Sequence, residues 1–101
     1  MVKIISYPMF RDFLSDYFVD VIPQKHGICV LGASIKVRLG AVNSIIRVSN
    51  PYGTVDFYYY PDVQKVVFYL QGIGEFTVNV KGFEIETGKE GEVCIKFRIL
   101  D

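Results

Sequence analysis

The hydrophobic period of this sequence changes near Pro23, and that change constrains the fold more than any other feature. Over residues 8–22 the apolar side chains recur every three or four positions, which is the spacing of one helix face. The stripe consists of Met9, Phe10, Phe13, Leu14, Tyr17, Phe18, Val21 and Ile22. Pro8 suits a first helical turn, Ser6 is placed to cap it, and Pro23 cannot continue the helix. The pattern therefore predicts an amphipathic helix over 8–22.

After Pro23 nearly every segment alternates with the two-residue period of a β-strand. The expected strands are 28–39, 45–49, 55–60, 65–71, 76–80, 83–86 and 93–99, with a short one at 2–5. Residues 65–71 are apolar on both faces, which is typical of a central strand covered on both sides. We therefore expect residues 1–101 to form a single α+β domain. Its one N-terminal amphipathic helix packs on a mainly antiparallel meander sheet of six or seven strands.

The apolar positions change parity at Lys81-Gly82, because those before it are even-numbered and those after it are odd-numbered. A two-residue turn would produce this change. A β-bulge with Gly82 in the left-handed conformation would produce it as well.

The sheet has more apolar surface than one helix can cover. A 15-residue helix is roughly 22 Å long and about 10 Å wide, whereas about six strands make a sheet close to 30 Å across. The sheet face opposite the expected helix carries tyrosines beside basic residues. Either the sheet closes into a barrel or sandwich, or this face packs against a second copy, or it binds another molecule.

Six residues of that face are the candidate binding residues: Tyr58, Tyr60, Tyr69, Lys36, Arg38 and Arg47. We expect a non-enzymatic interaction or assembly module. It uses this face to bind a protein partner or to form a homo-oligomer, for which a dimer is expected. The alternative is a single-stranded nucleic-acid-binding protein, in which bases stack on tyrosines and cations follow the phosphates. Lys65, Lys96 and Arg98 would join the cations if the strand order allows.

The composition argues against several other classes. Lys and Arg together number 11, as do Asp and Glu, so no overall field draws the protein to nucleic acid or to a membrane surface. No stretch approaches the ~20 apolar residues of a membrane span, and the N-terminus lacks the pattern of a secretory signal. We therefore expect a cytoplasmic protein without a membrane partner.

The residues with reactive side chains form no recognisable catalytic or metal motif. His26 lies three positions before Cys29, and Cys94 is far along the chain, so the paired spacings of a zinc site are missing. We expect reduced thiols, no cofactor and no bound metal, with a Cys29–Cys94 disulfide as the alternative if their strands are neighbours. A cluster of glutamates around residues 87–91 has two readings, a soluble hairpin or head-to-tail association with the Lys36, Arg38 and Arg47 group.

Overall fold

The computed structural model describes residues 3–6, 8–10, 12, 21–24, 27–30, 34–50, 53–70, 72–87 and 93–99. Nine strands account for most of these residues. They are β1 (Lys3–Ile5), β2 (Val21–Gln24), β3 (Gly27–Val30), β4 (Ser34–Leu39), β5 (Ser44–Asn50), β6 (Gly53–Tyr60), β7 (Lys65–Leu70), β8 (Gly74–Thr87) and β9 (Val93–Ile99). The N-terminal strand and most strands expected beyond residue 44 are confirmed, with ends that shift by one or two residues, whereas the strands expected at 76–80 and 83–86 form one continuous strand, β8.

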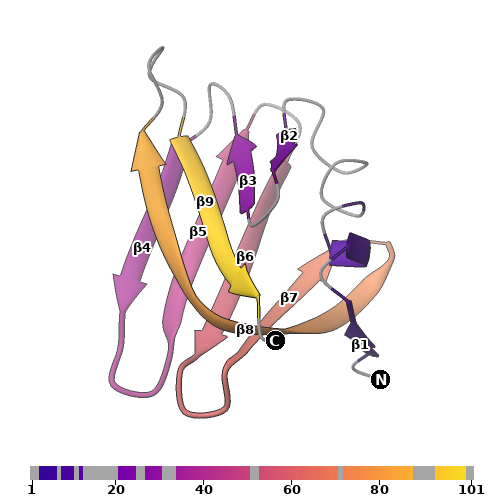
Figure 1. Cartoon of the computed structure of the whole chain (residues 1–101), viewed down its shortest axis with the longest axis vertical. Coiled ribbons are helices and arrows are strands. Elements are labelled where there is room, and N and C mark those ends of the chain that lie inside the picture. Colours follow the sequence, from indigo (N-terminus) through magenta and orange to yellow (C-terminus); the bar gives the residue numbers. More distant parts are fainter. Residues whose placement is uncertain are drawn as a thin grey trace.

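One sheet joins these strands in the order β2-β3-β9-β8-β7-β6-β5-β4, and β1 pairs with β8 beside that path. The pairing of β1 with β8 is parallel, and the other pairings are antiparallel, as expected. The first half of β8 pairs with β7 and the second half pairs with β9. The sheet thus folds over on itself along β8, and Figure 1 shows β9 and the end of β8 in front of β4, β5 and β6. We call β4 to β7 with the first half of β8 the long layer, and the second half of β8 with β9, β3 and β2 the short layer.

A β-bulge marks the bend of β8. Val80 pairs with Ile99 and Gly82 pairs with Arg98, so Lys81 is an extra residue in the strand. The bulge accounts for the change of parity seen in the sequence. The left-handed glycine expected there is wrong, because the described glycines with positive φ are Gly72, in the turn before β8, and Gly74, at the first position of β8.

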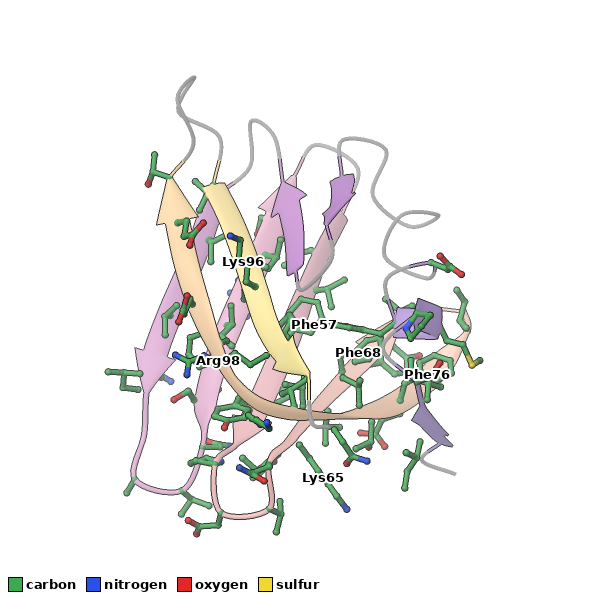
Figure 2. All side chains as sticks on the ribbon, viewed as in Figure 1. Phe57, Lys65, Phe68, Phe76, Lys96 and Arg98 are labelled. Carbon is green, nitrogen blue, oxygen red and sulfur yellow. The ribbon has the colours of Figure 1, made fainter. Side chains whose placement is uncertain are left out.

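The core lies between the two layers and is rich in phenylalanine. Phe10, Phe57, Phe68 and Phe97 are buried, at 0–1% exposure. The ring centroid of Phe10 lies 5.0 Å from that of Phe68 and 5.2 Å from that of Phe97, and those of Phe57 and Phe97 are 5.5 Å apart. Figure 2 shows Phe57 and Phe68 on neighbouring strands of the long layer, with β9 of the short layer passing in front. The short layer therefore covers the inner face of the long layer.

The predicted α+β architecture is wrong. The described residues contain a short helical stretch at Pro8–Phe10 and Asp12 but no helix of seven or more residues, and no amphipathic helix packs on the sheet. Residue 11 and residues 13–20 of the expected helix lie outside the described residues. Its last two residues belong to β2, where Pro23 pairs with Ile28. Proline is tolerated there because β2 is one of the two edge strands of the described sheet, and one of its sides needs no hydrogen-bond partner.

Three further expectations are corrected. The described strands number nine, partly because the segment expected as one strand at 28–39 contains both β3 and β4. The sheet is not closed, so the closed form expected as one alternative is wrong, although the sheet folds over into two layers that face each other. In β7, Val66, Phe68 and Leu70 are buried, whereas Tyr69 on the other face is 60% exposed. The strand is central in the sheet but is covered on one face only.

Candidate functional site

The outer face of the long layer gathers the six residues predicted to bind a partner. We call Lys36, Arg38, Arg47, Tyr58, Tyr60 and Tyr69 on this face the tyrosine face. They lie on β4, β5, β6 and β7, at positions that alternate along the strands with the inward positions. Strand parity therefore sends these side chains away from the core.

The strand register places four of the six residues close together. Lys36 is the partner of Arg47, and Arg47 is the partner of Asp56. One step along the strands, Arg38 pairs with Ile45, and Ile45 pairs with Tyr58. An open hollow of about 390 Å³ lies over these two rows, and it is lined by Lys36, Val37, Arg38, Ile45, Arg47, Asp56 and Tyr58.

Arg47 is held in the hollow by a two-point ion pair. Its Nε lies 2.8 Å from Oδ1 of Asp56, and its Nη2 donates to Oδ2 at 3.1 Å. The hydrogen bond to Asp56, followed by the charge of the same carboxylate, raises the pKa of Arg47 above its ordinary value. The carboxylate of Asp56 is therefore engaged, and the positive charges of the hollow exceed its negative charge by two.

Lys36 and Arg38 supply that excess. Neither side chain forms an ion pair with any other residue of the described part of the chain. Both lie on β4, the edge strand at the other end of the sheet from β2. The second side of β4 has no neighbouring strand in the described residues. Two exposed cations thus stand side by side along a free strand edge.

Tyr60 and Tyr69 lie on the same face but outside the hollow. Tyr60 is half-buried, and its register partner is Lys65, one of the additional cations expected for a nucleic-acid site. Tyr69 is exposed and pairs with Glu75. The structure therefore brings together Lys36, Arg38, Arg47 and Tyr58 around the hollow, and it leaves Tyr60, at the end of β6, and Tyr69, on β7, outside it.

Lys96 and Arg98 do not join this surface. They lie on β9 in the short layer, where Figure 2 shows them apart from Lys65. Nζ of Lys96 lies 2.9 Å from Oε2 of Glu86, and Nη2 of Arg98 lies 2.6 Å from Oε1 of Glu84. These basic residues on the outer face of the short layer thus form ion pairs with acidic residues of the same layer.

A second exposed feature escaped the sequence analysis. Ile35, Val37 and Leu39 occupy the inward positions of β4, yet only Ile35 packs against the core. Val37 is 39% exposed and Leu39 is 79% exposed. On the second half of β8, inward-facing Ile85 is 40% exposed. The alternation in the sequence predicts a buried face, and only the strand order reveals that this face ends at an open edge.

The cysteines are register partners. β3 and β9 are neighbours, and Cys29 lies directly opposite Cys94. This is the arrangement on which the disulfide alternative depended, while His26 lies outside the described residues. In the part of the chain that the structure describes, no group of three or more His, Cys, Asp or Glu residues is placed to hold a metal ion.

Comparison with protein-family models, with curated proteins and with solved structures finds no match for this chain. Within the described ranges, no helix is both long and apolar enough to cross a membrane. The case for a function therefore depends on the surface itself.

Proposed function

We propose that this protein is a non-enzymatic assembly module that self-associates through the open β4 side of its long layer. This side consists of the tyrosine face and the free edge of β4. The observation that supports the proposal is the edge itself, where Val37 and Leu39 face inward but stay exposed. A free strand edge with apolar side chains is a template for pairing with another chain.

The composition of the tyrosine face also favours a protein contact. Tyrosine and arginine are enriched in protein interfaces because they bury large areas and make several polar contacts. Tyr58 and Arg47 lie one row apart, and the ion pair with Asp56 holds Arg47 in a fixed position. A surface with fixed side chains loses less conformational entropy when it binds.

Sedimentation velocity over a concentration series from about 1 to 100 µM tests the proposal. We expect a reversible monomer–dimer equilibrium, with a dissociation constant in the range that small protein interfaces show. A single monomeric species over the whole range would contradict the proposal.

Single-stranded nucleic-acid binding is the second candidate. It is supported by the hollow, which combines Lys36 and Arg38 with the ring of Tyr58. Phosphates would contact the two cations while a base stacks on the tyrosine.

Fluorescence polarisation with a labelled oligonucleotide, at several salt concentrations, tests this candidate. Specific use of the hollow predicts binding that weakens with salt and is lost in Tyr58→Ala combined with Arg38→Ala. Lys96→Ala is the matched control, because Lys96 lies in the other layer. The absence of binding at low salt would eliminate this candidate.

A further inference from the structure

We propose that two copies associate edge to edge, with β4 of each copy pairing antiparallel with residues 82–87 of the other. This inference rests on the proposed function in that it requires the chain to self-associate, and it names the strands that meet. Within the part of the chain that the structure describes, both strands have a free side. β4 ends the sheet, and residues 82–87 of β8 pair only with β9 among the described residues.

The two free edges belong to different layers on the same side of the view in Figure 1. β4 points downward there, and β8 ends pointing upward. A two-fold axis along the strands exchanges the layers and keeps these directions. Each β4 would then meet the end of β8 from the second copy as an antiparallel neighbour, and both layers would continue across the contact.

Charge favours this pairing over the pairing of β4 with itself. An antiparallel β4–β4 contact centred on Val37 would place Lys36 opposite Arg38 of the second copy, and like charges opposite each other are destabilising. Residues 82–87 instead present Glu84 and Glu86 on their outward positions. A register that opposes Lys36 to Glu86 and Arg38 to Glu84 of the second copy pairs every outward charge with its opposite.

The carboxylates can accept these contacts. Glu84 uses Oε1 for Arg98 and Glu86 uses Oε2 for Lys96, both on the β9 side. Each carboxylate has a second oxygen with its own acceptor sites. The side chains of Glu84 and Glu86 are 50% and 49% exposed, so a cation from the other side can reach them.

The same register matches the inward positions. It opposes Val37 to Ile85, and Leu39 to Phe83, of the second copy. Val37, Leu39 and Ile85 are exposed apolar residues in the single chain, whereas Phe83 is partly buried against the core. The contact would cover them and join the two cores, so a single offset satisfies both faces of the strand pair.

Complementary charge reversal tests this pairing. The first variant is Lys36→Glu with Arg38→Glu, and the second is Glu84→Lys with Glu86→Lys. Each alone opposes like charges at both edges of the dimer, and we expect its dissociation constant to rise at least about tenfold. An equimolar mixture opposes unlike charges at both edges, because each variant keeps one native strand, and it should form a heterodimer.

Lys65→Glu is the control, since Lys65 lies on the outer face of β7, away from both edges. It should leave dimerisation unchanged. The second variant removes two ion pairs with β9, so its folding is checked by circular dichroism. An independent measurement is hydrogen exchange of the wild type, in which the β4 amides should exchange more slowly as the protein concentration rises.

The outcomes separate the two proposals. Dimers lost in each variant and restored by mixing would support the edge pairing. A wild-type dimer that neither variant weakens would overturn the edge pairing and leave self-association standing. A wild-type monomer at all concentrations would overturn both.

Discussion

At the scale of single residues, Tyr59 connects the two layers at the bend of β8. Its hydroxyl donates a 2.7 Å hydrogen bond to the carbonyl of Lys81, the extra residue of the bulge. Its ring centroid lies 5.6 Å from that of Phe83 in an edge-to-face arrangement. The side chain therefore contacts β8 at the position where the strand leaves one layer for the other.

Replacing Tyr59 by phenylalanine should lower the free energy of unfolding by about 1 kcal/mol. The ring is kept, but the carbonyl of Lys81 loses a partner. Tyr60→Phe is the control, because Tyr60 is half-buried on the outer face and its change should stay within about 0.5 kcal/mol. Urea denaturation of the three proteins measures the difference. Equal midpoints for Tyr59→Phe and the wild type would show that the hydrogen bond is not needed at the bend.

Residue patterns in the sequence identify which side chains face inward, but not what covers them. Alternation places Tyr58 and Tyr69 on one face of the sheet, and the structure has Phe57 and Phe68 buried on the opposite face. The cover of the inner face depends on contacts between residues far apart, such as Phe57 with Phe97. No local period contains that information.

At the scale of elements, two glycines, one in the turn after β4 and one at the bulge of β8, differ in whether a side chain would fit there. A Cβ on Gly40, after β4, would lie 2.6 Å from the carbonyl oxygen of Asn43. A Cβ on Gly82, at the bulge, would lie 3.9 Å from the hydroxyl of Tyr59, which is an ordinary contact. Only Gly40 therefore requires a residue without a side chain.

Gly40→Ala should therefore destabilise the fold by about 1–3 kcal/mol, since the backbone of the turn must move. Gly82→Ala should change stability by less than about 1 kcal/mol. Thermal unfolding of both variants provides the comparison. A larger loss for Gly82→Ala than for Gly40→Ala would contradict the geometry of the bulge.

A second prediction at the scale of elements follows from the pairing of β3 with β9. Directly opposed residues of antiparallel strands have Cα atoms about 4.5–5.5 Å apart, a separation that a disulfide spans. Oxidised glutathione should therefore convert Cys29 and Cys94 into a disulfide by thiol–disulfide exchange, with two equivalents of reduced glutathione released. Mass spectrometry of a proteolytic digest identifies the linked peptides, and Cys29→Ser is the control. Glutathione adducts without the link would contradict the register.

The element predictions failed where two periods fit the same residues. The stripe from Met9 to Ile22 has helical spacing, but Val21–Gln24 pairs with Gly27–Val30 as a short antiparallel pair. That pairing is stabilised by β9 on the other side of β3, more than sixty residues away in sequence. The segment 28–39 failed for a similar reason, because continuous alternation does not reveal that β3 and β4 belong to different layers.

At the scale of the whole molecule, the sequence predicts which residues form the candidate site but not how they are arranged in space. Strand parity alone put Lys36, Arg38, Arg47 and Tyr58 on one face. Their gathering around one hollow depends on β4 being the neighbour of β5 and the last strand of the sheet. Strand order is set by contacts between distant parts of the chain, which no local pattern contains.

Ionic strength distinguishes the forces that hold the proposed dimer together. The opposed charges of β4 and β8 are exposed, so salt screens them, with a Debye length of about 10 Å at 0.1 M falling to about 3 Å at 1 M. The dissociation constant should rise severalfold between these two conditions. Sedimentation equilibrium in sodium chloride measures it. A constant that stays level or falls would indicate that apolar burial alone drives the association.

The parallel pairing of β1 with β8 has a consequence for synthesis on the ribosome. Ile4 and Ile5 are translated before their partners Thr77 and Val78, which follow only after β2 to β7. The rings of Phe10 and Phe57 likewise gain their contact with Phe97 only after β9 has been translated. A nascent chain therefore exposes apolar aromatic surface until β9 has left the ribosome, and a molecular chaperone would protect it most during that interval.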